Sequence, residues 1–548
     1  MGAIQFPFVQ TKLVNYFSSN LSEATGFEIS VEAIDIDWFD QVELNGLKVI
    51  DPDGNRLFYT QSAEINFDIR ALINRKNRNI DEVIVNNASL YFTKISIGDT
   101  TRTLNINALI RRVKDALRRQ QKSRKFFSID KVILNNAALT YFEDDSIKTL
   151  RKGLDAKHFS IENIHGSFRN LQTMSDTLRV QVNHLSAIEY LSGLELHNMV
   201  TDFHLSQSSM RFDGVRLEVG KSYIADTVIF NYSSTKDLSE FVDEVIIDAH
   251  LKNAKISTQD LALFTPVLER YNDRFIVNGK FEGKIKAFVL EDARVKLGKN
   301  TALRGKIRMT GLPDFQETFI DFDLDNSKVK ITDLQQYLKT TTYDRLSPFT
   351  IIRLNASFLG FPNDFVAKGD FYTNFGRITS DINLKLRPNI NASSYSGTLK
   401  LAKFDLGGYT SNNFFNKVTL NGKIEGNGFT LEEADFKLKG HITRIGLYGY
   451  EYSDIDTDAR FTKEFFKGFL KVNDPNLKLT TTGSIDLREG INFFNINAQL
   501  DTLNLKPLNL TDNHVFLRSN IMINATGLEL DSIIGQADLL DTYVEYGE

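Results

Sequence analysis

The sequence predicts a mainly β protein: an elongated, repeating β-groove, which is a taco-like, curled antiparallel sheet with a hydrophobic interior. An N-terminal amphipathic helix and a few short helices complete the predicted fold. Two observations favour it. Most segments alternate apolar and polar residues at the period of a half-buried strand. Nine segments interrupt this alternation once in the same way, which indicates a repeated structural unit.

The first element is a helix. In MGAIQFPFVQTKLVNYFSSNLSEATG, apolar residues at Val9, Leu13, Phe17 and Leu21 follow helical spacing, and Gly26 is a suitable end. The predicted domains are therefore residues 1–26, a membrane-proximal helix, and residues 27–548, a repeating β-groove. The helix either plugs one end of the β structure or follows a membrane anchor that would precede Ala3.

The interrupted strands come next. FVLEDARVKL from Phe288 places apolar residues at i, i+2, i+5, i+7 and i+9, and eight other segments share this spacing. They begin at Val42, Val83, Val132, Leu194, Met210, Ala249, Phe322 and Phe429. The two polar residues in the gap fit a hairpin turn or a β-bulge. Because Glu291–Asp292 and Glu432–Glu433 do not readily take φ > 0 at both positions, we interpret each copy as one bent strand of about ten residues.

The apolar residues of these copies are expected to line the interior of the groove. At about ten residues per strand, roughly 40 strands would extend the groove on the order of 200 Å. The predicted lipid-binding residues are Val42, Leu44, Leu47, Val49, Val83, Val85, Ala88, Leu90, Val132, Leu134, Leu139, Phe288, Leu290, Val295, Leu297, Phe429, Leu431, Phe436 and Leu438.

Two further helical patterns lie within the strands. The segment from Ile106 has an apolar stripe surrounded by basic residues. It is either a packed helix with a solvated face or a contact for anionic headgroups or an acidic partner, through Arg111, Arg112, Arg118 and Arg119. The segment from Gln259 is predicted to pack, with a kink or break at Pro266.

Catalytic and metal-binding signatures are absent from the sequence. There is no cysteine, and no zincin, hydrolase-elbow or phosphate-loop motif, so we expect no enzyme activity and no cofactor. The acidic clusters DFDLDN and DIDTD alternate with apolar residues, as on the wet face of a strand, and the eight histidines lack ligand spacing. Nearly balanced charge does not indicate nucleic acid, and no apolar run reaches the ~18–20 residues of a membrane-spanning helix.

Helices are too few to cover the predicted apolar face. Contiguous apolar surface beyond a few hundred Å² is rarely left in water without a function. The occupant of the groove is therefore expected to be apolar and elongated, which describes acyl chains.

Several segments resemble a known family. PFVQTKLVNYFSSNLSEATGFEISVEAIDIDWFDQVELNGLKVIDPDGNRL is similar to the N-terminal region of the TamB branch of the AsmA-like envelope proteins, in its Bacteroidetes-like form. ISTQDLALFTPVLE and GKFEGKIKAFVLEDARVKLGKNTALRGKIRMTGLPDF also look like TamB segments. The resemblance runs through most of the chain, but it consists of patterned strands rather than invariant residues.

This resemblance implies a periplasmic protein of a Gram-negative cell envelope, anchored in the inner membrane, whose groove conducts phospholipid between inner and outer membranes. It also implies an outer-membrane partner of the BamA-like, TamA type, contacted through a C-terminal domain beyond VEYGE. The chain would then be part of a longer array.

Two other functions remain open at this level. The sheet could be an assembly scaffold that assists outer-membrane protein insertion by strand addition. A secreted β-solenoid adhesin or lyase fits less well, because solenoids repeat at short, regular periods, whereas the copies here begin at irregular intervals.

Overall fold

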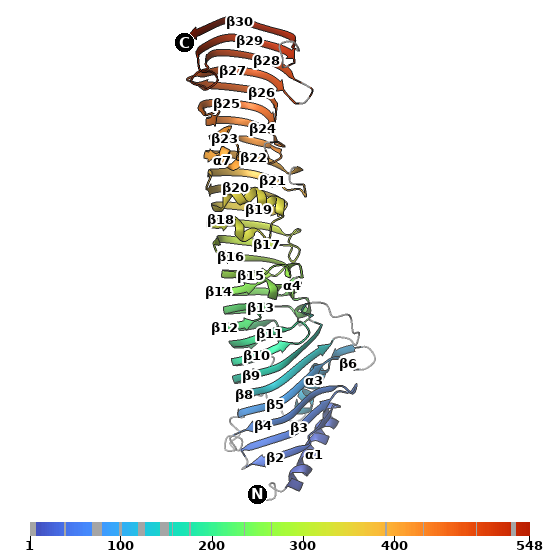
Figure 1. Cartoon of the computed structure of the whole chain (residues 1–548). Coiled ribbons are helices and arrows are strands. Elements are labelled where there is room, and N and C mark those ends of the chain that lie inside the picture. Colours follow the sequence, from blue (N-terminus) through green and yellow to red (C-terminus); the bar gives the residue numbers. More distant parts are fainter. Residues whose placement is uncertain are drawn as a thin grey trace. The chain divides into compact units, whose positions relative to one another are not determined.

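The computed structural model describes residues 7–37, 40–67, 79–97, 101–118, 127–142, 153–155, 157–174, 177–234, 236–264, 266–389, 392–430, 432–488, 490, 492–527 and 533–547. The protein is mainly β, with 68% of its residues in strands and 11% in helices. Its main sheet has 28 strands and curls without closing on itself, and β6 and β7 form a separate two-stranded sheet (Figure 1). The chain divides into two compact units, residues 1–291 and 292–548.

The first unit carries the longer helices. Its elements are α1 (Pro7–Thr25), β1 (Glu28–Ser30), β2 (Ala33–Asp37), β3 (Gln41–Ile50), β4 (Arg56–Asn66), β5 (Asn79–Phe92), β6 (Lys94–Ile97), β7 (Thr101–Leu104), α3 (Asn105–Arg118), β8 (Phe127–Phe142), β9 (His158–Met174), β10 (Thr177–Glu189), β11 (Leu194–Leu205), β12 (Ser209–Val219), β13 (Ser222–Asn231), η2 (Asp237–Glu240), α4 (Phe241–Glu244), β14 (Ile246–Ser257), α5 (Thr258–Leu261), η3 (Pro266–Leu268) and β15 (Arg274–Lys284), where η marks a 3₁₀ helix. The boundary falls within β16 (Ala287–Leu297).

The second unit is an antiparallel meander with short helical connections. Its elements are β17 (Thr301–Thr310), β18 (Phe319–Lys330), η4 (Ile331–Leu334), α6 (Thr340–Leu346), η5 (Ser347–Phe349), β19 (Ile351–Phe361), β20 (Asp364–Thr373), β21 (Gly376–Lys385), β22 (Ser394–Asp405), α7 (Leu406–Thr410), β23 (Phe415–Asn427), β24 (Asp435–Leu447), β25 (Tyr450–Thr462), β26 (Phe465–Asp474), β27 (Leu477–Asp486), β28 (Phe493–Asn504), β29 (His514–Thr526) and β30 (Ile534–Gly547).

The bulge interpretation is confirmed by a register shift at the gap in five of the nine copies, those from Val132, Leu194, Met210, Ala249 and Phe322. The copies from Val42 and Val83 continue as single strands, but they keep their register through the gap. In seven copies, the second polar residue of the gap has left-handed backbone, with φ between 45° and 64°, at Gly46, Asn87, Asn136, Gly214, Asn253, Asp292 and Asn326. Glycine, asparagine and aspartate tolerate this conformation best. In the copy from Leu194, the pairing with β12 shifts register between Leu196 and Asn198.

The ninth copy, from Phe429, is not a bulged strand, and the prediction was wrong there. β23 ends at Asn427 and β24 begins at Asp435, so the polar gap is a turn in which Ala434 N donates to Thr430 O at 2.8 Å. Glu433, the second gap residue, lacks the left-handed preference of glycine, asparagine and aspartate. The type of residue at the second gap position therefore distinguishes the copies that continue as one strand from the copy that forms a turn.

Two further expectations need correction. The sheet is not wholly antiparallel, because β5 pairs with β8 in parallel. The intervening β6, β7 and α3 supply the long crossover that a parallel pair requires. The estimate of roughly 40 strands was also too high for the main sheet, because many strands exceed ten residues and β9 has 17.

The predicted helices are present. α1 ends before Gly26, whose φ is +68° and whose N–H donates to Ser22 O at 2.7 Å. α3 packs near the same end, where a small core joins the unit's first strands to α3: Phe27, Val49, Leu57, Ile95 and Ala108. The segment from Gln259 is split, as predicted, into α5 and η3, which begins at Pro266.

Candidate functional site

The candidate site is the inner face of the sheet, best defined in the second unit. There the strand registers align side chains into four rows that cross the strands. Residues directly paired across an antiparallel sheet point to the same face. Each row is therefore a continuous line of neighbouring side chains.

The rows have these members, from β19 onward. The first row is Gly360, Phe365, Leu384, Tyr395, Gly426, Phe436, Phe461, Phe466, Ile485, Phe494, Ala525 and Gly535. The second is Phe358, Ala367, Ile382, Gly397, Ile424, Leu438, Ala459, Gly468, Gly483, Ile496, Ile523 and Ala537. The third is Ala356, Gly369, Ser380, Leu399, Gly422, Gly440, Thr457, Leu470, Thr481, Ala498, Ile521 and Leu539. The fourth is Leu354, Phe371, Ile378, Leu401, Leu420, Ile442, Ile455, Val472, Leu479, Leu500 and Ser519.

The composition of the four rows makes the inner face uncharged and largely apolar. None of these residues is charged. The first row is rich in aromatic residues, the fourth is mostly aliphatic, and the two middle rows contain most of the glycines, alanines, serines and threonines. Several of these glycines have φ near +140°, a conformation restricted to glycine; at Gly483, with φ 144°, a Cβ would lie 2.0 Å from Asn495 O. The small middle rows thus let neighbouring backbones approach closely.

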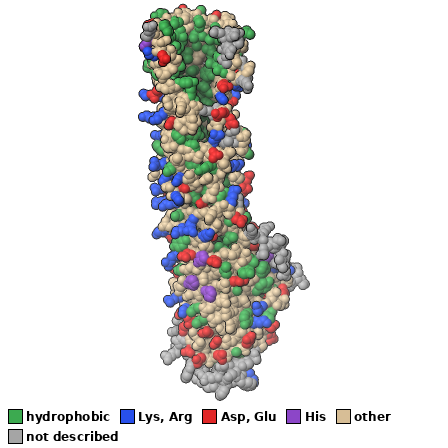
Figure 2. All heavy atoms as spheres, in the orientation of Figure 1, with side chains coloured by type: hydrophobic (Ala, Val, Ile, Leu, Met, Phe, Trp, Pro, Cys, Tyr) green, Lys and Arg blue, Asp and Glu red, His purple; other side chains and the backbone are tan. Residues whose placement is uncertain are grey.

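The opposite face of the same strands is polar. Cross-strand ion pairs lie along it, including Lys368 with Asp381 at 3.0 Å, Lys439 with Asp458 at 2.9 Å and Arg444 with Glu451 at 2.9 Å. Figure 2 shows charged side chains along the outer surface, and hydrophobic side chains gathered in the hollow over the C-terminal strands of the second unit. The sheet therefore separates an apolar inner face from a charged outer face.

Within the described part of the chain, no second layer covers the inner face to the extent found in globular folds. The accessible surface is 32619 Å², whereas a compact protein of this length exposes about 20,000 Å². Even in the middle of the sheet, many row residues are only half-buried. The inner face is thus accessible to an apolar ligand.

The last residue of β26, Asp474, is a buried carboxylate on the inner side of the sheet, and both of its oxygens accept hydrogen bonds. Asp474, 1% exposed, accepts hydrogen bonds from Tyr450 Oη at 2.7 Å, from Ser453 N at 3.0 Å and Ser453 Oγ at 2.9 Å, and from Asn476 N at 2.9 Å. Burial acts to raise the pKa of Asp474, but these hydrogen bonds outweigh it and the pKa is lowered. The Asp474 carboxylate therefore stabilises the turn after β26, and its oxygens are already occupied by hydrogen bonds within the protein.

The predicted groove residues of β3, β5 and β8 are brought together as expected. Val42, Val83 and Val132 belong to one row, which includes Ile65 and Phe168. Leu44, Val85 and Leu134 share the next row through Ala63. The remaining members join in the same way: Leu47 and Ala88 through Thr60, and Val49, Leu90 and Leu139 through Phe58.

The later predicted residues have mixed outcomes. On β16, Leu290 is 5% exposed and Leu297 8% exposed, and Val295 is half-buried. Phe288 stacks on Phe281, with ring centroids 4.6 Å apart. Phe436 and Leu438 lie in the first and second rows of the second unit. Phe429 lies in the β23–β24 turn, with its ring centroid 5.4 Å from that of Tyr395, and Leu431 lies outside the described residues.

Most residues of the four rows were absent from the predicted set. They belong to regular strands such as β20 and β27, whose alternation was visible in DFVAKGDFYT and LKLTTTGSID. The prediction concentrated on the interrupted strands and so omitted the uninterrupted ones. The alternation of inner and outer residues along these strands would have been enough to assign them to the inner face.

Among the arginines predicted on the basic helix α3, Arg112 makes a specific contact. Arg112 Nη1 donates to Thr25 O at 2.8 Å, and its guanidinium lies 5.7 Å from the centroid of the Phe27 ring. Arg112 thus ties α3 to the end of α1. Arg111 is exposed, whereas the side chain of Arg118 and the whole of Arg119 lie outside the described residues.

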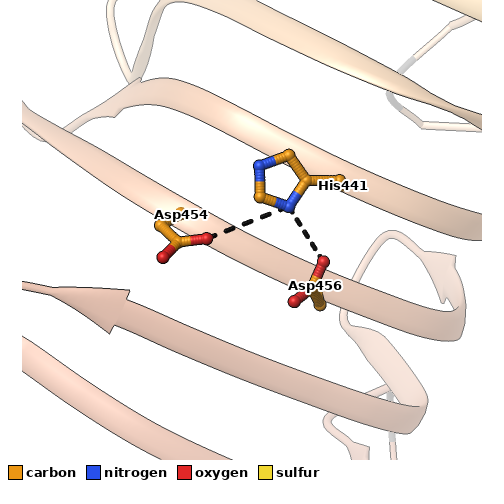
Figure 3. A group of neighbouring side chains, drawn as sticks. All are labelled: His441, Asp454 and Asp456. Atoms are coloured by element: carbon orange, nitrogen blue, oxygen red, sulfur yellow. Dashed lines mark hydrogen bonds and ion pairs between the residues drawn. The ribbon is translucent and has the colours of Figure 1, made fainter.

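A histidine and two aspartates meet on the outer face (Figure 3). His441 on β24 lies opposite Asp456 on β25, with Nδ1 2.9 Å from Asp456 Oδ1 and 3.9 Å from Asp454 Oδ1. Asp454 also accepts a hydrogen bond from Asn473 Nδ2 at 2.8 Å. The sequence showed no ligand spacing because the histidine comes from the neighbouring strand. Both aspartates are exposed, and the group is accounted for as a cross-strand ion-pair cluster.

Within the described part of the chain, none of the helices combines the length and the hydropathy that a membrane crossing requires. Comparison with family models, with curated proteins and with solved structures finds no match for this chain.

Proposed function

We propose that this protein holds acyl chains on the inner face of its curled sheet and conducts phospholipid between two membranes. In this proposal it is an AsmA-like, TamB-type protein of the Gram-negative envelope, in the periplasm, with an inner-membrane anchor in the full-length form. Its partners are phospholipid, the two membranes and a BamA-like outer-membrane protein. It has no catalytic residues and needs no cofactor.

The observation that carries the proposal is the set of four uncharged rows in the second unit. An acyl chain is long and apolar, and it gains about 0.8 kcal/mol for each CH₂ removed from water. The rows offer such a chain an apolar path from strand to strand, with no charged side chain within them to be desolvated. The polar outer face meanwhile keeps the sheet in water.

The test is photo-crosslinking combined with lipid mass spectrometry. A photoreactive residue at Leu438, in the second row, is expected to capture phospholipid when the protein is purified without detergent from cells. The matched control places it at Lys437, the preceding residue on the outer face of β24. We expect lipid adducts at Leu438 and none at Lys437.

Two other outcomes would redirect the proposal. Peptide adducts at Leu438 without lipid would favour the assembly scaffold, in which client strands occupy the sheet. The absence of any co-purified lipid, together with equal labelling at both positions, would contradict a lipid-binding inner face.

A further inference from the structure

The hydroxyl groups on the inner face are engaged within the protein. Ser380 Oγ donates to Ala367 O at 3.0 Å, Thr457 Oγ1 to Phe469 O at 3.1 Å, and Thr481 Oγ1 to Asn497 O at 3.2 Å. In the fourth row, Ser519 Oγ lies 2.8 Å from Thr542 Oγ1. Every serine and threonine of the four rows therefore has a partner inside the protein.

The first unit repeats this arrangement. Thr60 lies on the inner face between Leu47 and Ala88, and its Oγ1 is 2.8 Å from Asn86 O and 2.9 Å from Ser62 O. Thr201, paired with Val182, donates to Asp213 O at 3.1 Å. In each case an acceptor residue, Asn86 or Asp213, directly precedes a residue with left-handed backbone, Asn87 or Gly214. These serine and threonine hydroxyls are thus hydrogen-bonded within the protein, and among the described residues of the four rows only the Tyr395 phenol is a hydroxyl without a partner.

We infer that the groove recognises unsubstituted hydrocarbon chains and discriminates against chains that carry a hydroxyl group along their length. This inference rests on the proposed function and specifies its substrate class. A hydroxyl buried without a hydrogen-bond partner loses its hydration and gains nothing in return. Outside the reach of the Tyr395 phenol, a chain hydroxyl laid against the rows should therefore lose water without gaining a hydrogen-bond donor from the protein, whatever headgroup the lipid carries.

The experiment measures displacement of a fluorescent fatty acid from the purified chain by stearate and by 12-hydroxystearate. These two acids share chain length and carboxylate and differ by one mid-chain hydroxyl. We expect 12-hydroxystearate to compete at least about tenfold more weakly, which is the loss typical of an unsatisfied buried hydroxyl.

Two variants test whether the hydrogen-bonded hydroxyls of the inner face cause the discrimination between the two acids. Thr481→Ala removes the hydroxyl and opens the space it occupied, so Asn497 O becomes accessible to a ligand hydroxyl. The discrimination between the two acids should narrow to about threefold or less. Tyr395 in the first row has no hydrogen-bond partner among the described residues, and burial raises its pKa to about 12, so its phenol stays neutral. Tyr395→Phe is the control, and it should retain discrimination at least as strong as that of the wild type.

The outcomes separate the two proposals. If neither acid displaces the probe and the probe itself does not bind, the lipid-binding function fails, and the inference fails with it. If both acids compete equally, the function stands and the inference is overturned, because the inner face must then offer the hydroxyl a partner. Discrimination that Thr481→Ala leaves unchanged would also overturn it, since the hydrogen-bonded hydroxyls would not be its cause.

Discussion

At the scale of single residues, a buried carboxylate on the inner side of the sheet is stabilised by hydrogen bonds within the protein. This carboxylate, Asp474, is almost fully buried and still has a lowered pKa. A carboxylate with a lowered pKa in the folded state stabilises the fold above its unfolded pKa of about 3.9. That stabilisation is lost as the pH falls through the folded-state pKa.

Asp474→Asn tests this reasoning. The amide nitrogen replaces one carboxylate oxygen and cannot accept: at the Oδ2 position it loses the bonds from Ser453 N and Oγ, and at the Oδ1 position those from Tyr450 Oη and Asn476 N. The free energy of unfolding at pH 7 should therefore fall by about 1–3 kcal/mol. Below about pH 4 the difference from the wild type should shrink, because the wild-type carboxyl then becomes protonated. Urea unfolding followed by circular dichroism at several pH values measures both effects. Asp512→Asn, in the exposed β28–β29 turn, is the control and should change little.

At the scale of elements, the bulges are specified by one residue each. Asn136 of β8 has φ 58°, and its side chain donates from Nδ2 to Asn87 Oδ1 of β5 at 2.7 Å. Asn87 in turn donates to Gln61 Oε1 of β4 at 2.5 Å. A ladder of amides therefore joins the left-handed positions of the parallel pair to the next strand.

Asn136→Ala and Asn136→Gly separate the two contributions. Both remove the ladder hydrogen bond, but only alanine pays the cost of left-handed backbone, which is about 1–2 kcal/mol. We expect Asn136→Ala to lower the free energy of unfolding by roughly 1 kcal/mol more than Asn136→Gly. A glycine variant less stable than the alanine variant would contradict the assigned role of the backbone conformation. Urea unfolding of the two proteins makes the comparison.

The predictability of the elements follows from the same physics. Alternation and the residues in the gap identify a bulged strand, because asparagine, aspartate and glycine accept φ > 0. Glu433 shows where the spacing alone misleads. The parallel pairing of β5 with β8 was not predictable from the strand patterns, since both strands have the alternation of antiparallel ones. The register between neighbouring strands could not be read from the sequence either, so the sequence did not show that His441 and Asp456 lie opposite each other.

At the scale of the whole molecule, the proposed conduction of lipid requires an unbroken apolar path. The stripe residues of the first unit were predicted because alternation assigns each residue to a face. The rows themselves required the register of every strand pair, which no local pattern encodes. A charge placed in a row must be desolvated by each passing chain, at a cost of several kcal/mol in a dry setting.

Leu438 lies in the second row, and its side chain is 7% exposed. The substitution Leu438→Asp places a charge in that row. A barrier of ~3 kcal/mol would slow lipid movement more than a hundredfold. We expect transfer between vesicles by the full-length protein to fall accordingly, with circular dichroism unchanged. Lys423→Asp, on the exposed outer face of β23, is the control and should transfer lipid normally. Normal transfer by Leu438→Asp would exclude sliding along the rows.

The uninterrupted rows of the second unit have one more consequence, which concerns how its length can vary. Each strand from β19 to β29 contributes one residue to every row, so a hairpin is a self-contained module. Removing β20 and β21, whose pairings with each other and with their neighbours have no register shift, would leave β19 and β22 antiparallel and in step. Removing a single strand would place two strands of the same direction side by side, and a short turn cannot join these. Viable shortening or lengthening should therefore occur in even numbers of strands, so that the unit grows by pairs.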